Sequence, residues 1–425
     1  MGDGTPLTIN RDTVRRSTDR SIPIMSLRHP TRLGIDVPLL LIVSLLLVFG
    51  LLMLYSASTD YSLFFYGDPI YQFSRQLIWA GLSIGVAIGL GWLNYRIWLK
   101  LVLPAMLITI VGLVGVLLLS IVSINYKRWL FGGSVQPSEA AKVILIIYLA
   151  VWLYNKREQI RDLNFGLIPL STILGILGGL ILLQDDLSAT VIIFILGGLM
   201  FFLAGGDSRQ IVIFLVVALI VGAIVFQFYP KGRTRMEEYR AGLQDITKAP
   251  EQLSRALEAI VKGGWFGVGI GRSETKLTGL SLAPTDSIFA VVAEETGIFG
   301  SASLAVLYIL LMWRGLVIAQ RAPDSLGKLL ASGLSIWITL EALINMTVLV
   351  GLAPFAGTAL PFVSYGGSSL ITMFAGIGII FSVSRQSAKK REAEERTFDA
   401  VVDLRRRDGG RHLPRSRRSS TFEKR

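Results

Sequence analysis

Apolar stretches alternate with short polar segments along most of the chain. A helix needs about 20 apolar residues to cross the ~30 Å hydrocarbon core of a bilayer, and somewhat shorter helices can be accommodated by tilting or by local thinning. Suitable stretches occur at 37–57, 76–93, 97–122, 139–154, 165–183, 187–204, 209–229, 285–313, 326–352 and 369–384. The pattern therefore predicts an all-α integral membrane protein with about ten transmembrane helices.

The longest polar loop, residues 230–284, lies between the seventh and eighth predicted spans. Within it, Leu253, Leu257, Ile260 and Val261 share one face of a predicted amphipathic helix that would lie on the membrane surface or on the bundle. The glycine-rich segment 263–271 follows. Its amides could cradle a phosphate, although the absence of a following Gly-Lys-Ser/Thr argues against a nucleotide-binding P-loop.

The composition supports a membrane location and an orientation. Hydrophobic residues make up 52% of the chain and charged residues only 17%, while the net charge is +12. Much of the basic excess lies in the tails, 1–36 and 386–425, which predicts cytoplasmic termini, a disordered C-terminal tail and an extracytoplasmic loop 230–284. Anionic lipid near such tails explains the charge, so we expect no nucleic-acid partner.

Some chemistry is excluded by residue counts. The chain has no cysteine, so it has no disulfide, thiolate nucleophile or cysteine metal site. Its two histidines, His29 and His412, fall in the tails. Candidate chemistry therefore rests on carboxylates, basic side chains and hydroxyls.

Asp286 stands where the long loop enters the eighth predicted span. An ionised carboxylate near hydrocarbon is costly unless it is paired or hydrated, so such residues usually line a polar cavity, bind a cation or handle protons. Pro284–Thr285–Asp286 also resembles a helix start, where an acid interacts favourably with the helix dipole. Both interpretations stay open from spacing alone. Glu294 and Glu295 in the same span are either structural or cavity-lining.

Further charged residues lie at the same, non-cytoplasmic end of the predicted bundle. Glu139 and Lys142 are three residues apart and can pair on one helical face, either as part of a site or as a pair that makes burial tolerable. Asp186, Arg75 and Arg128 fall at this end by topology. Basic residues in short outward loops suggest an anionic partner.

The segment 354–369 is uncharged and contains two prolines, three glycines and three serines, Ser364, Ser368 and Ser369. Irregular backbone at membrane depth survives only where it is buried in protein or lines a wet cavity. A plain connecting turn is the alternative, but it would not need this composition.

Five segments together resemble one family. They are Arg75–Gln76, 128–142, 184–190, 263–300 and LPFVSYGGSSL at 360–370, in order and with matching spacing. The chain is similar over about 37–385 to the SEDS family of bacterial membrane proteins (shape, elongation, division and sporulation; the FtsW/RodA/SpoVE group). It departs from the family pattern at Asp185, Ala356 and Ala283–Pro284, and the last change weakens any role for acids just before Asp286.

The resemblance implies a peptidoglycan glycosyltransferase in the bacterial cytoplasmic membrane. Such an enzyme polymerises lipid II, a disaccharide-pentapeptide on undecaprenyl pyrophosphate, at the outer face. It works with a class B penicillin-binding protein and other division or elongation proteins. A lipid II flippase and a non-catalytic scaffold are the alternatives. The segment 285–289 and the long basic tail favour a division-type member over an elongation-type one.

The resemblance also implies roles for the polar residues. Asp286 matches the essential loop aspartate of the family and is expected to be the general base. Lys142, Arg75 and Arg128 are expected to contact pyrophosphate or acceptor.

The remaining polar residues have supporting roles in this interpretation. Glu139 and Asp186 would orient Lys142 or hold a hydrated Mg²⁺ or Mn²⁺. Ser364, Ser368 and Ser369 would shape the cavity.

Overall fold

A computed structural model describes residues 34–122, 136–245, 248–280, 282–354 and 357–408. The described secondary structure is helical and contains no strand, as predicted. The helices are α1 (Val37–Tyr66), α2 (Tyr71–Trp92), η1 (Tyr95–Ile97), α3 (Trp98–Val122), α4 (Pro137–Asn155), α5 (Leu167–Leu183), α6 (Leu187–Leu203), α7 (Ser208–Phe228), α8 (Pro230–Gln244), α9 (Glu251–Gly263), α10 (Ile288–Gln320), α11 (Ser325–Leu349) and α12 (Gly367–Asp408).

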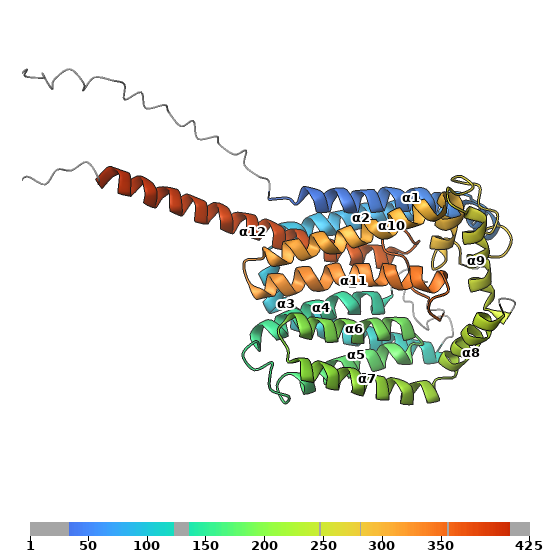
Figure 1. Cartoon of the computed structure of the whole chain (residues 1–425), viewed down its shortest axis with the longest axis horizontal. Helices are drawn as coiled ribbons and strands as arrows, with labels where there is room; N and C mark the ends of the chain where they lie inside the picture. Colours follow the sequence, from blue (N-terminus) through green and yellow to red (C-terminus); the bar gives the residue numbers. More distant parts are fainter. Residues whose placement is uncertain (1–33, 123–135, 246–247, 281, 355–356, 409–425) are drawn as a thin grey trace, which may run out of the picture. The chain divides into compact units, whose positions relative to one another are not determined.

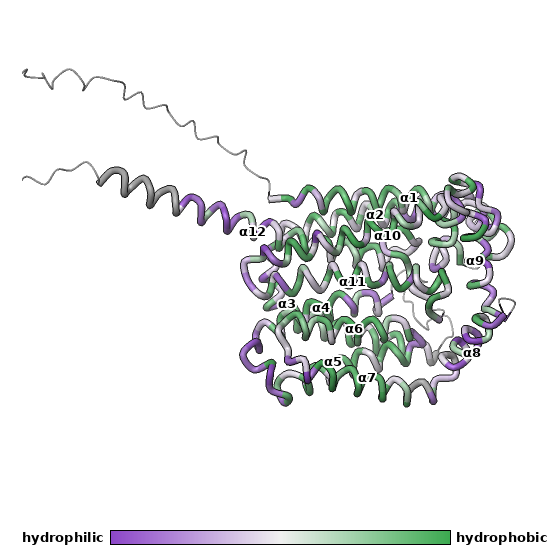
Figure 2. The backbone as a smooth tube through the Cα atoms, in the orientation of Figure 1, coloured by the Kyte–Doolittle hydropathy of each residue, from purple (hydrophilic) through white to green (hydrophobic). Residues whose placement is uncertain are grey.

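Seven of the described helices are long and apolar enough to cross a membrane, and α5, α6 and part of α7 are shorter apolar helices. Figure 2 shows hydrophobic residues along the bundle and hydrophilic residues concentrated at its ends, in α8 and in the part of α12 that leaves the bundle. Each apolar stretch predicted from the sequence overlaps one of these helices. The protein is therefore a multi-pass membrane protein.

Helix α1 extends well past the predicted end of its apolar stretch at residue 57. Hydropathy falls there because serines and an aspartate appear, but Ser56, Ser58 and Ser62 are buried inside the protein and the helix continues. It ends at Gly67, which adopts a left-handed conformation with φ of 72°. The drop in hydropathy thus ended the predicted span at polar residues, although the helix itself continues to Tyr66.

Helices α4 and α11 form the centre of the bundle. Their apolar windows are 67% and 78% buried, whereas those of α2 and α3 are 17% and 28% buried. Helix α11 packs against α10, α12, α4 and α6 (Figure 1). The charged side chains Lys142 on α4 and Glu341 on α11 are consequently surrounded by protein.

Helices α8 and α9 cross one end of the bundle, and α9 packs on α10 and α11 (Figure 1). The predicted helix is confirmed, and Leu253 of its predicted apolar face is buried, but the other buried residues lie outside that face. The buried residues are Leu253, Ala256, Ala259 and Gly263, and Val261 is 79% exposed. Small residues face α10 because its backbone comes close: a side chain on Gly263 would collide with the carbonyl of Ala293.

The glycine-rich segment after α9 stabilises a break in α10. Gly297 interrupts the helix with φ of 68°. The amides of Val268 and Gly269 donate to the carbonyls of Glu294 and Glu295 at 3.0 and 3.1 Å. Since these amides are used within the protein, the interpretation of this segment as a phosphate cradle gains no support.

Candidate functional site

A cavity of about 300 Å³ lies at the end of the bundle where α10 begins. We call it the chamber. Its walls come from the beginnings of α4, α6 and α12, from the turn before α10, from α11 and from the segment after it. The predicted site residues that line it are Glu139, Lys142, Asp186, Asp286 and Ser369. The chain thus brings together residues that are far apart in sequence.

Lys142 is buried in the chamber wall between two carboxylates. Its Nζ donates to Oε1 of Glu139 at 2.9 Å, which is the pair expected from the spacing, and it also forms an ion pair with Glu341. The ammonium group lies 5.9 Å from the ring centroid of Trp337, and Trp337 Nε1 donates to Glu341 at 2.9 Å. Lys142, Glu139, Glu341 and Trp337 are hereafter the Lys142 cluster.

Glu341 is the functional candidate that the sequence interpretation missed. It lies in the middle of α11, is 3% exposed and lines the chamber. The sequence does carry a signal for Glu341, because a lone carboxylate inside a long apolar span is rare and usually faces a partner or a cavity. Its pairing with Lys142 could not be inferred, because Lys142 is on α4 and remote in sequence.

Asp186 helps to hold the chamber wall together. One oxygen accepts the amide of Ala189 at 3.2 Å and caps the start of α6. The other accepts from Gln136 Nε2 and Ser138 Oγ, each at 3.3 Å, at the start of α4. These contacts fix two helix ends and do not include Lys142, which Asp186 was expected to orient.

Asp286 lies one residue before the cap of α10. Ser287 occupies the N-cap position, and its side chain makes no capping bond. Asn345 on α11 holds the local backbone through one amide group, which donates to the carbonyls of Asp286 at 2.9 Å and Thr358 at 2.6 Å. A Cβ on Gly357 would lie only 2.9 Å from the Asp286 carboxylate, so glycine leaves the space that this carboxylate occupies.

The segment 357–366 is fastened to its neighbours by hydrogen bonds. Ser364 Oγ accepts the amide of Leu360 and donates to the carbonyl of Thr285, both at 2.7 Å. Ser368 accepts the amide of Gln136 at 3.0 Å. Ser364 and Ser368 therefore position the walls, whereas Ser369 faces the chamber.

Two of the predicted cations are not among the lining residues. Arg75 donates to the hydroxyl of Tyr71 at 2.9 Å. Burial raises the pKa of the Tyr365 hydroxyl, and the nearby charge of Arg75 opposes this rise, so Arg75 lies close to a residue that does line the chamber. Arg128 lies outside the described residues.

A second buried ionic cluster lies where the loop after α9 meets α1 and the first part of α10. Glu294 accepts from the hydroxyls of Ser273 and Thr275. Glu295 accepts from Ser56 Oγ at 2.5 Å and lies 3.5 Å from Lys276 Nζ. Lys276, Glu294 and Glu295 with these hydroxyl residues are hereafter the Lys276 cluster, and their contacts favour the structural interpretation of the two glutamates.

The described residues contain no group of three or more His, Cys, Asp or Glu side chains placed to hold a metal ion. Glu139 and Asp186 line the same chamber, and each accepts hydrogen bonds from protein donors. The Mg²⁺ or Mn²⁺ expected there stays a prediction, and no chemical step is derived through it.

The fold and the chamber define a class: an all-α, multi-pass membrane protein with a charged cavity enclosed by its helices. The chain belongs to the cell cycle protein family of FtsW, RodA and SpoVE, whose model matches residues 37–389. This range includes every described residue of the chamber.

Relatives agree over nearly their whole lengths. A Trichlorobacter lovleyi protein named "Probable peptidoglycan glycosyltransferase FtsW" is 35% identical over 84% of this chain and 95% of the relative. Stage V sporulation protein E of Bacillus subtilis is 34% identical over 83% of this chain and 97% of the relative.

Solved structures agree as well. The structure titled "Structural coordination of polymerization and crosslinking by a peptidoglycan synthase complex" contains a chain with a TM-score of 0.67 and 26% identity, covering 84% of this chain and 99% of that one. The crystal structure of Thermus thermophilus rod shape determining protein RodA has a TM-score of 0.59 and 26% sequence identity, and the match covers 84% of this chain and 98% of that one.

Proposed function

We propose that the chamber is the active site of a peptidoglycan glycosyltransferase that polymerises lipid II, with Asp286 as its general base. Family membership and the names of the relatives support the enzyme class. The single observation that carries the site is the position of Asp286: its backbone is fixed by Asn345, and it lines a cavity together with a buried cation. A carboxylate that is rigidly held and reachable from a cavity is suited to proton transfer.

The proposed reaction joins two sugars. The Asp286 carboxylate takes the proton from the 4-hydroxyl of the acceptor GlcNAc as that oxygen attacks the anomeric carbon of the donor. A new C–O glycosidic bond forms, and the bond from the anomeric carbon to the undecaprenyl pyrophosphate breaks. The pyrophosphate leaves with the bonding electron pair, so cationic groups near it lower the barrier.

The Lys142 cluster limits which groups can neutralise that leaving charge. Lys142 is already compensated by Glu139 and Glu341, so its main proposed role is to fix the chamber wall and to offer a local dipole. Arg75, near the chamber-lining Tyr365, and Arg128 are then the proposed pyrophosphate contacts, and guanidinium groups suit the bidentate geometry of phosphate. A divalent cation accompanying the substrate would add to this neutralisation.

We place the chamber, with loop 230–284, at the outer face of the bacterial cytoplasmic membrane, and both termini in the cytoplasm. The basic tails support this orientation. The proposed partner is a class B penicillin-binding protein that crosslinks the glycan, in line with a solved neighbour whose title couples polymerisation to crosslinking. Other division or elongation proteins would complete the complex.

A polymerisation assay with purified protein tests this function. With its transpeptidase partner, the protein is expected to extend labelled lipid II into glycan that lysozyme digests, and Asp286→Ala is expected to stop it while the variant stays folded. If lipid II crosses liposome membranes but no polymer forms from the intact complex, the protein is a flippase. If Asp286→Ala supports normal growth as long as partner binding persists, it is a scaffold.

A further inference from the structure

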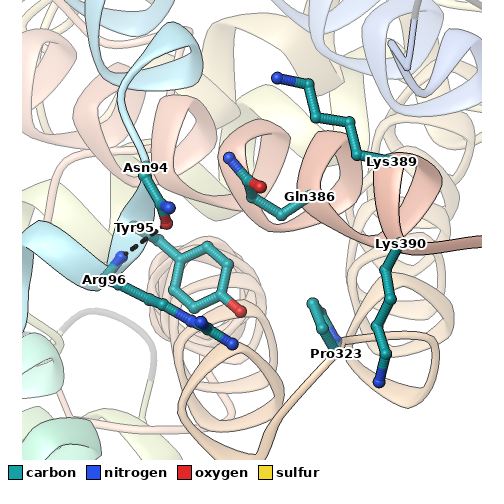
Figure 3. A pocket seen from close by; sticks show the side chains of 7 residues that line it. All are labelled: Asn94, Tyr95, Arg96, Pro323, Gln386, Lys389 and Lys390. Carbon is teal, nitrogen blue, oxygen red and sulfur yellow. Dashed lines mark hydrogen bonds between the residues drawn. The ribbon is translucent and has the colours of Figure 1, made fainter. Parts of the chain in front are cut away.

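A second cavity, of about 330 Å³, lies at the opposite end of the bundle from the chamber. It is lined by the turn at Asn94 and Arg96, by Pro323 before α11, and by Gln386, Lys389 and Lys390 of α12 (Figure 3). Figure 3 shows the two lysine side chains leaving α12 in different directions, with Lys390 extending toward Pro323. We call this cavity the basic pocket. Neither the family match nor the proposed reaction gives it a role.

The frame of the basic pocket is held rigidly. Ser382 of α12 accepts the amide of Tyr95 at 3.0 Å and donates to the carbonyl of Leu93 at 2.5 Å. The hydroxyl of Tyr95 donates to Asp324 at 2.9 Å, and Arg96 donates to the same carboxylate at 2.8 and 3.0 Å. Three separate segments are thereby locked together, so the pocket does not need to form when a ligand arrives.

The lining of the basic pocket is cationic, and Arg96 has N–H groups that Asp324 does not use. Arg96, Lys389 and Lys390 are cationic, and no acid is among the lining residues. Asp324 uses two of the five N–H groups that a guanidinium carries. Glu394 on α12 lies 3.9 Å from Lys390 in an exposed pair that contributes little. The pocket therefore favours an anion.

The pocket also lies at the level of lipid head groups. Ser369 of α12 lines the chamber and Lys389 of the same helix lines the basic pocket. At 1.5 Å per residue the helix rises about 30 Å between them, which is the thickness of the hydrocarbon core. Trp92, 74% exposed, stands beside this end under Arg385, whose guanidinium carbon is 5.7 Å from the ring centroid. Tryptophan is typical of this depth.

We propose that the basic pocket binds the phosphodiester group of an anionic membrane phospholipid on the face of the membrane opposite the chamber. Charge, rigidity and depth each favour this ligand. A basic recess between helices at the membrane surface is a recognised way to hold a lipid head group. The acyl chains would leave the pocket past the exposed side chains of Trp92 and Leu93. The proposal does not depend on the reaction in the chamber.

Native mass spectrometry of the full chain in detergent tests it, with phosphatidylglycerol as the probe. The variant Lys389→Gln/Lys390→Gln removes two lining charges. The matched control Arg391→Gln/Arg396→Gln removes two charges from the same helix that do not line the pocket. At about 1 kcal/mol for each lysine that contacts the phosphodiester directly, we expect the dissociation constant of the first bound phosphatidylglycerol to rise about 25-fold in the pocket variant. The control is expected to stay within about twofold of the wild type, because salt screens charges that do not contact the bound phosphate.

Two further arms identify the source of the phosphate. Phosphatidylcholine should bind the wild type more weakly, and inorganic phosphate should fail to displace phosphatidylglycerol. The proposal is overturned if both double variants lose affinity equally, since the effect is then diffuse attraction. It is also overturned if phosphatidylcholine binds equally well, or if inorganic phosphate displaces the lipid. Thermal unfolding of each variant checks that all of them are folded.

Discussion

The described part of the protein contains two buried clusters of nearly the same composition, and of these the Lys142 cluster lines the chamber. The Lys142 cluster and the Lys276 cluster each combine one lysine with two glutamates. Each also leaves one glutamate oxygen without a hydrogen bond among the described residues, Oε2 of Glu139 and Oε2 of Glu295. Composition and ion pairing alone therefore do not distinguish a functional ionic cluster from a purely structural one.

The surroundings do distinguish them. Members of the Lys142 cluster line the chamber together with Asp286, whereas no member of the Lys276 cluster lines the chamber or the basic pocket. Glu294 accepts from two hydroxyls and from the amides of Glu274 and Thr275, which is the pattern of a carboxylate that holds a loop in place. Access to the chamber, more than burial of charge, therefore marks the reactive region.

The largest expected effect comes from the chamber carboxylate. Asp286→Asn keeps the shape of the side chain but removes the base. We expect the turnover number for lipid II polymerisation to fall by about 10²–10⁴-fold, the usual contribution of general acid–base catalysis. The unfolding temperature should change little. If the variant retains more than a tenth of the wild-type rate, the chamber is no more catalytic than the Lys276 cluster.

The next effect is on stability within the chamber. Lys142→Met leaves the buried Glu341 without its cation, and breaking a buried pair in this way typically costs about 3–5 kcal/mol. Adding Glu341→Gln removes the excess charge and keeps an acceptor for Trp337, so the double variant should regain most of the lost stability. Thermal unfolding in detergent measures both. If the double variant is no more stable than the single one, Lys142 and Glu341 are not coupled.

The Lys276 cluster should respond in stability alone. Glu294→Gln weakens several hydrogen bonds to a charged acceptor, each worth about 1.5–3 kcal/mol, and we expect a net loss in this range. Below the unfolding temperature, polymerisation should stay within about threefold of the wild type, because the residue is remote from the proposed chemistry. A selective loss of turnover in a fully folded variant would move this cluster into the functional class.

The smallest effect concerns the segment that closes the chamber. Ser364→Ala removes the hydroxyl that links Leu360 to Thr285, at an expected cost of about 0.5–1.5 kcal/mol. Ser369→Ala is the matched control, since its side chain faces the chamber and does not link these segments. Chemical unfolding compares the two. Equal stability of both variants would mean that Ser364 does not position the segment.

Much of the fold was predictable because lipid-facing helices carry long apolar stretches that hydropathy detects directly. The protein-facing details were not. The end of α1 was missed because polar residues past position 57 lower the hydropathy although the helix continues to Tyr66. The buried alanines and glycine of α9 were missed because close helix contacts select small residues over larger apolar side chains.

The site was predictable in part for a similar reason. Glu139 and Lys142 are neighbours on one helix, so their pairing could be inferred from spacing. Glu341 and Lys142 are 199 positions apart in the sequence, so no local pattern encodes their contact. Asp186 was placed at the same end of the bundle by topology, but its contacts with α4 and α6 depend on how those helices pack.

The central claim is that Asp286 performs chemistry in a chamber that other residues build. Measuring lipid II binding and glycan formation separately for Asp286→Asn, in the intact complex with its transpeptidase, tests this claim most directly. We predict that the variant binds labelled lipid II within about threefold of the wild-type affinity and forms glycan at least about 10²-fold more slowly, because a general base acts only in the transition state. Glycan formation at the wild-type rate, or a loss of binding that fully explains the lost rate, would contradict the account.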